Sequence, residues 1–274
     1  MPLAEAHRPN NLEHREETAK NMAHSSVRID RSGVVGNPLP SIASVALLTA
    51  ALGGVLAHEA HWAGRHVVAG LTGYAAVSVI IALTAGIGRG RVGFGIANQV
   101  TLLRAGLVCL IGGALLASGP SSLLGWSLAA VVAAALSLDA VDGWLARRLG
   151  LSSSFGARFD LEIDALLILI LALLVWRADR VGGWVLAIGL LRYLFVLAGS
   201  LLPWLRRPLP PSRRRQAVCV QQGVTLLFCL LPPVSTGLAS LTAGLALLSL
   251  LASFATDIIY LARARAAERR HAAA

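Results

Sequence analysis

Eight long apolar runs constrain the fold of this chain more than any other feature of its sequence. A helix needs about 20 apolar residues to cross the hydrocarbon core of a bilayer, and each run is long enough, or nearly so, to span it. Hydrophobic residues make up 56% of the chain and charged residues only 14%, a composition that excludes a soluble enzyme. We therefore expect an all-α polytopic membrane protein. The runs cover about residues 41–57, 67–87, 98–118, 123–146, 156–176, 182–202, 216–231 and 238–261.

The net charge of +10 is spread over short basic clusters between the apolar runs. These clusters do not form the single basic face of a nucleic-acid-binding protein, so we expect no nucleic-acid partner. If the N-terminal segment is cytoplasmic, eight spans place on that side all of the 24 basic residues except Arg65, Arg177, Arg180 and Arg192. Arg104, near the start of a run, counts among the cytoplasmic residues. Because cytoplasmic loops are rich in Lys and Arg, we expect both termini in the cytoplasm and the protein in the inner membrane of the cell.

Four aspartates lie near the predicted cytoplasmic ends of two successive apolar runs. Asp139 and Asp142 are three residues apart and Asp160 and Asp164 four apart, so each pair lies on one face of its helix. The short polar turn between the helices makes these faces neighbours. Carboxylates that converge at a membrane boundary repel one another, and a hard cation with oxygen ligands relieves that repulsion. The pattern therefore predicts a Mg²⁺ or Mn²⁺ site, which suits a diphosphate substrate.

Small residues share the helix faces that carry the aspartates. Gly143 and Ala146 follow Asp142 on the first helix, and Gly156 precedes Asp160 by four residues on the second. They give the clearance that a nucleotide needs beside a helix, or they pack the helices together. The sequence leaves both interpretations open.

The segment from Asp139 to Asp164 reads D-x2-D-G-x2-A-R-x8-G-x3-D-x3-D, and it resembles the signature of the CDP-alcohol phosphatidyltransferases. Upstream, Asn98, Thr101 and Arg104 resemble the Asn-x-x-Thr-x-x-Arg opening of the first core helix of that family. The resemblance covers about residues 98–265. It implies a homodimer in which each chain has a six-helix core with a polar cavity open to the cytoplasm.

This resemblance divides the chain into four parts. Residues 91–265 would form the family core, and residues 40–90 would add a transmembrane helix pair before it. We expect a polar, disordered cytoplasmic tail over residues 1–39 and a basic cytoplasmic tail over residues 266–274.

The resemblance also implies a role for each motif residue. Asp139, Asp142 and Asp160 would hold two Mg²⁺ or Mn²⁺ ions, and Asp164, which shares this metal site, would be the general base. The remaining motif positions would bind the CDP-lipid together with Asp142. They are Asn98, Thr101, Gly143, Ala146, Arg147 and Gly156. Arg147 would pair with a carboxylate or with phosphate, and the sequence does not decide between them.

Recognition of the acceptor alcohol rests on arginines. Arg192 lies within an apolar run, where it would bind a substrate phosphate or form an ion pair with one of the aspartates. Arg215, nearest the following helix in a basic loop, is the second candidate, although topology control or contact with anionic lipid is the expected role of most arginines there. Glycerophosphate-using members of the family resemble one another in an Arg-Glu pair and a Lys-x-Lys-Thr element, which this chain lacks.

Two further acids have expected partners outside the metal site. Glu162 is offset by two residues from both Asp160 and Asp164, so we expect it to face a basic residue on another side of its helix. Asp257 lies near the end of the last run, where we expect it to pair with Arg263 or Arg265.

These observations predict an enzyme that moves a phosphatidyl group from CDP-diacylglycerol to a small phosphorylated alcohol, of the glycerol 3-phosphate or inositol phosphate type, with release of CMP in phospholipid biosynthesis. Within the family, the alternative is a CDP-choline or CDP-ethanolamine phosphotransferase that acts on diacylglycerol. Outside it, the alternatives are a non-catalytic membrane scaffold and a carrier whose acids bind cations.

Overall fold

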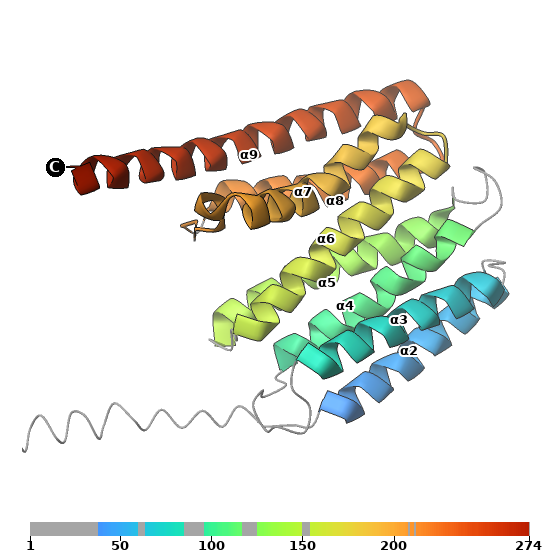
Figure 1. Ribbon diagram of the computed structural model, residues 1–274. Helices are drawn as coiled ribbons and strands as arrows, with labels where there is room; N and C mark the ends of the chain where they lie inside the picture. Colours follow the sequence, from blue (N-terminus) through green and yellow to red (C-terminus); the bar gives the residue numbers. More distant parts are fainter. Residues whose placement is uncertain are drawn as a thin grey trace, which may run out of the picture. The chain divides into compact units, whose positions relative to one another are not determined.

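The computed structural model describes residues 38–59, 64–84, 96–116, 125–149, 154–207, 209–210 and 212–273, and all of these residues belong to one unit. The predicted tail over residues 1–39 thus lies almost wholly outside the described residues. The described chain contains eight α-helices and no strand, which confirms the predicted all-α class (Figure 1). The helices are α2 (Pro38–Glu59), α3 (Gly64–Thr84), α4 (Ile96–Gly113), α5 (Trp126–Leu149), α6 (Ser154–Arg177), α7 (Leu186–Leu201), α8 (Arg213–Leu230) and α9 (Thr236–Ala273).

Each predicted apolar run corresponds to one of these helices. Five of them, α2, α3, α4, α7 and α9, are long and apolar enough to cross a membrane, so the chain is a multi-pass membrane protein. The other three described helices carry polar residues inside their runs. The apolar part of α5 ends at Asp139, α6 carries charged residues from Arg158 to Asp164, and α8 begins with three arginines. Helices of this kind line polar sites, because charge facing lipid is costly.

Helix α4 is the most enclosed of the five apolar helices. Two thirds of its spanning segment is buried (67%), against 22% in each of the other four. It contacts α2, α3, α5 and α6 (Figure 1), and its side chains Leu102, Val108 and Ile111 are fully buried. Most residues on α4 are therefore surrounded by protein rather than by lipid.

Small residues allow the N-terminal helix pair to approach α4 closely. A Cβ atom on Gly70 of α3 would lie 2.9 Å from the Cα atom of Leu110. A Cβ atom on Gly113 would overlap the carbonyl oxygen of His66, and one on Gly106 would overlap the hydroxyl of Thr49. Such contacts are the usual means by which membrane helices pack, because lipid provides no hydrophobic force between them.

Helix α9 continues well beyond the predicted run, and its 38 residues far exceed the length of about 20 that a span requires. The predicted basic tail over residues 266–274 is therefore helical as far as Ala273. Its Ala, Arg and Glu residues favour helix, and no Gly or Pro interrupts them. A short 3₁₀ helix, η4 (Pro203–Arg206), packs against α9, and two contacts hold the extension there. Both terminal nitrogens of Arg207 donate to the carboxylate of Glu268, and Arg265 lies 5.6 Å from the ring centre of Trp204.

Arg180 joins the turn after α6 to the C-terminal end of α8 and the turn that follows it. This buried side chain follows α6, and it donates from Nε to the carbonyl oxygen of Cys229 at 3.0 Å. Its Nη2 donates to the carbonyl oxygens of Leu231 and Val234. These acceptors lie at the end of α8 and in the following turn, where helix carbonyls lack partners within the helix, so Arg180 serves as a cap for α8.

Candidate active site

The candidate site begins with Arg104 on α4. Its side chain has no exposed surface, which fits the enclosed position of α4. A guanidinium buried in this way requires negatively charged or carbonyl partners. Those partners come from α5 and α6, which lie on one side of α4 (Figure 1).

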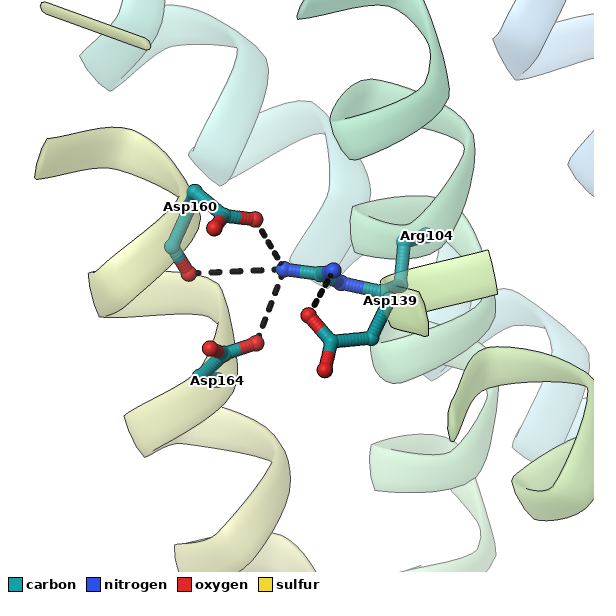
Figure 2. Close-up of polar contacts among 4 residues, drawn as sticks. All are labelled: Arg104, Asp139, Asp160 and Asp164. Atoms are coloured by element: carbon teal, nitrogen blue, oxygen red, sulfur yellow. Dashed lines mark hydrogen bonds and ion pairs between the residues drawn. The ribbon is translucent and has the colours of Figure 1, made fainter. Parts of the chain in front are cut away.

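Three aspartates supply the negative charge (Figure 2). Nη1 of Arg104 donates to Oδ1 of Asp139 on α5 at 2.5 Å. Nη2 donates to Oδ1 of Asp164 on α6 at 2.8 Å, and also to the side chain and the backbone carbonyl oxygen of Asp160. We refer to Asp139, Asp160 and Asp164 as the aspartate cluster. Residues from two helices thus converge, as the helical spacing of the motif and the short turn predict, and the cation that they share is Arg104.

The aspartate cluster has the composition of a divalent cation site. One carboxylate oxygen from each of the three residues lies within 4.8 Å of the other two. The side chains remain 21–36% exposed, so ions can reach them although Arg104 is covered. When all three carboxylates are ionised, a single guanidinium leaves the cluster negative. Oxygen ligands and excess negative charge fit Mg²⁺ or Mn²⁺.

The other predicted motif residues lie on the same three helices. Thr101 is buried on α4, three residues before Arg104, and therefore on the same side of that helix. Gly156 lies in the first turn of α6, four residues before Asp160. The backbones of the remaining positions are helical, but their side chains lie outside the described residues. These positions are Asn98 on α4 and Asp142, Gly143, Ala146 and Arg147 on α5.

Arg192 pairs with Glu162 rather than with an aspartate. Nη2 of this α7 arginine lies 2.5 Å from Oε1 of Glu162 on α6. The described contacts therefore do not show the predicted alternative, an ion pair between Arg192 and one of the motif aspartates. They confirm the prediction that Glu162 faces a basic residue. The pair adjoins the helix of the cluster, because Glu162 lies between Asp160 and Asp164 on α6.

The predicted partners of Asp257 are wrong. Asp257 is buried on α9 and accepts from Arg214 at 2.5 Å and from Arg215 at 3.2 Å. Helices α8 and α9 are joined by a short turn and pack against each other, so the beginning of α8 meets the later part of α9. The sequence suggested partners on α9 itself, but the packing of α8 against α9 brings Arg214 and Arg215 closer to Asp257. Arg215 also donates to the carbonyl oxygen of Pro210.

The sequence analysis did not predict the role of Arg104 in this site. It was expected to act as a topology determinant near the membrane surface, besides matching the family opening, yet the structure buries it at the centre of the aspartate cluster. Its signal lies in the sequence: it follows Leu102 and Leu103 inside an apolar run. An arginine within a predicted span usually faces an acidic partner inside the protein.

Taken together, the fold and the cluster define a multi-pass membrane protein with an acidic site between helices whose carboxylates could hold a metal ion. Residues 94–256, more than half of the chain, match the family model described as CDP-alcohol phosphatidyltransferase, and the chain belongs to that family. The match begins just before α4, so α2 and α3 lie outside it. No solved structure matches the chain. The protein is accordingly an enzyme of a family that transfers a substituted phosphate group from a CDP-alcohol to an acceptor and that generally uses divalent metal ions.

Proposed function

We propose that this enzyme transfers the phosphatidyl group of CDP-diacylglycerol to a small phosphorylated alcohol and releases CMP, as a step of phospholipid biosynthesis. The observation that carries the proposal is the aspartate cluster. Its carboxylates come from two helices and converge within 4.8 Å, inside the region that matches the family model. Such a cluster has the charge and the ligand type that a metal-bound diphosphate requires.

Asp139, Asp142 and Asp160 would hold two Mg²⁺ or Mn²⁺ ions, with Asp164 at the same site. Ions bound there would neutralise charge on the diphosphate and on the departing CMP. The partial exposure of the cluster supports this assignment, because a substrate must reach the ions from outside the helix bundle. The family match supports it as well.

Asp164 would act as the general base. It would accept the proton of the acceptor hydroxyl, whose oxygen forms a bond to the lipid-side phosphorus while the bond from that phosphorus to the CMP oxygen breaks. Asp164 is the least exposed member of the cluster, at 21% against 30% and 36%. It also lies one helical turn further along α6 than Asp160. This position is consistent with a carboxylate that meets the acceptor rather than the nucleotide.

The nucleotide would lie along α4, α5 and the start of α6. Asn98 and Thr101 would donate or accept hydrogen bonds, and Arg147 would pair with phosphate or with a carboxylate. The small residues Gly143, Ala146 and Gly156 would allow the cytidine to approach the backbone. The burial of Thr101 beside Arg104 supports a nucleotide site that reaches the cluster.

Arg192 would bind the phosphate of the acceptor. Its guanidinium already binds the carboxylate of Glu162 on the helix that carries Asp164, and a phosphate oxygen can take the place of a carboxylate oxygen in such a pair. Arg215 is the second candidate, and Asp257 holds it at the start of α8. An arginine near the general base favours an anionic acceptor over serine.

We also propose a homodimer with both termini and the site on the cytoplasmic side of the inner membrane. The family core would cover residues 91–265, and α2 with α3 would form the N-terminal addition over residues 40–90. Support for this division comes from the family match, which begins after α3.

The test is CMP release by the purified enzyme from CDP-diacylglycerol with Mg²⁺ or Mn²⁺. Glycerol 3-phosphate, inositol 1-phosphate, inositol, serine and water are offered separately. We expect release with one phosphorylated alcohol, and an Arg192→Gln variant with a raised KM for that acceptor and an unchanged KM for the CDP-lipid. Release from CDP-choline or CDP-ethanolamine with diacylglycerol, and none from CDP-diacylglycerol, would refute the proposal.

A further inference from the structure

Arg104 places a positive charge at a cluster of carboxylates that is also suited to a metal ion. Its guanidinium donates to every member of the aspartate cluster, and Nη2 also donates to the backbone carbonyl oxygen of Asp160 at 3.4 Å. The side chain is completely covered. It therefore cannot leave for water without moving helices, and its charge stays at the cluster.

A metal ion that binds to the aspartate cluster would add a positive charge beside the guanidinium of Arg104. An ion held by the Oδ1 atoms of the cluster takes the oxygens to which Arg104 donates. An ion held by the other oxygens of the same carboxylates would still lie close to the guanidinium. Because like charges close together repel one another at a partly buried site, the guanidinium would weaken metal binding in either position.

The same charge stabilises the cluster without a metal ion. Carboxylates from α5 and α6 that lie this close together repel one another, and Arg104 joins them to α4. Deleting a guanidinium that is hydrogen-bonded to three partly exposed carboxylates would leave those charges without this partner, which is unfavourable.

We propose that Arg104 is a built-in counter-ion of the active site, which holds the aspartate cluster together and competes with divalent cations for it. Arg104 is in this sense a positioning residue that sets the affinity of the metal site. The inference rests on the proposed function, because it takes the aspartate cluster to be the metal site.

The experiment measures Mn²⁺ binding to the full-length protein in detergent. The protein is stripped of metal with a chelator, the chelator is removed, and free Mn²⁺ is counted by its electron paramagnetic resonance signal during titration. The melting temperature is recorded without and with Mn²⁺. Wild type is compared with Arg104→Gln, with Arg104→Lys, and with Arg207→Gln as a control that removes one arginine from an exposed ion pair elsewhere.

We expect Arg104→Gln to bind Mn²⁺ more tightly than wild type by about tenfold or more and to melt at a lower temperature without metal, with Mn²⁺ restoring much of the loss. Arg104→Lys keeps a charge but cannot bind three carboxylates at once, so its affinity should lie between the two. This second variant keeps the test decisive if the Gln variant does not fold. Arg207→Gln should bind Mn²⁺ as wild type does.

Two results would overturn the inference. Unchanged or weaker Mn²⁺ binding in the folded Arg104 variants, with clear binding in wild type, would show that the arginine is only a structural partner, and the proposed metal site would stand. Loss of Mn²⁺ binding from wild type and variants alike would refute the metal site and the inference together.

Discussion

At the scale of single residues, the site depends on how charge is shared among Arg104 and the aspartate cluster. Each carboxylate accepts through one oxygen from the same guanidinium. The three differ in exposure, and Asp139 lies on α5 whereas Asp160 and Asp164 lie on α6. Under the proposed function, the more exposed Asp139 and Asp160 would hold metal, and the more enclosed Asp164 would accept the proton.

Replacing Asp164 with Asn tests this assignment of the base. The amide keeps the size of the side chain but cannot accept a proton from the acceptor hydroxyl, so turnover should fall by about 100-fold or more. Binding of CDP-diacylglycerol, measured by titration calorimetry in the presence of metal, should remain close to that of wild type. Equal loss of binding and turnover would place Asp164 with the metal ligands instead.

The sequence predicted the residues of this site better than their contacts. Helical periodicity, a local property, places Asp160 and Asp164 on one face of α6, and the short turn after α5 predicted that this face meets Asp139. The partners of Arg104, Arg192 and Asp257 depend on which helices pack side by side, and a single sequence does not contain that information.

At the scale of elements, α4 connects the N-terminal helix pair to the site. It carries Arg104, and its outer side packs against α3 through glycines that leave no room for a side chain. The sequence predicted these helices from their apolar runs but not the order of packing, because apolar residues that face lipid and apolar residues that face protein look alike.

A methyl group at Gly113 should disturb this packing. Its Cβ atom would overlap the carbonyl oxygen of His66, so Gly113→Ala should destabilise the protein by about 1–3 kcal/mol and lower activity through displacement of α4. The matched control is Gly54→Ala on α2, where a Cβ atom would meet nothing within 4 Å. Thermal unfolding in detergent measures both. Equal melting temperatures for the two variants would contradict the close approach of α3 and α4.

Removing the cap that Arg180 provides should have a larger effect. Arg180→Met would leave carbonyl oxygens of Cys229, Leu231 and Val234 without this donor, at a cost of about 2–4 kcal/mol in the free energy of unfolding. Arg213→Met, at the exposed start of the same helix, serves as the control and should unfold like wild type. A destabilisation shared by both variants would show that the charge, and not the cap, matters.

At the scale of the whole molecule, the distribution of basic residues predicts the orientation of the chain in the membrane. Arg214, Arg215 and Arg207 lie at the beginning of α8 or just before it, with partners on the later part of α9, whereas Arg180 is at the other end of α8. The described helices agree with the predicted runs, but α5, α6 and α8 are not among the helices that are long and apolar enough to span.

Reporter fusions test the predicted orientation. Green fluorescent protein fused after Ala274, or before Met1, should fluoresce, because both termini are predicted to be cytoplasmic. Alkaline phosphatase, which is active only outside the cytoplasm, should be active when inserted between α2 and α3 and inactive at either terminus. Phosphatase activity at the C-terminus would mean an odd number of spans.

The most direct test of the central claim is the metal dependence of CMP release from CDP-diacylglycerol in one preparation of the enzyme, with an Asp139→Asn variant beside it. We predict release with Mg²⁺ or Mn²⁺, loss of release with excess chelator, recovery when metal is added back, and at most about one-hundredth of the wild-type rate in the variant. Release that continues in chelator, or in the variant at the rate of wild type, would contradict an active site built on the aspartate cluster.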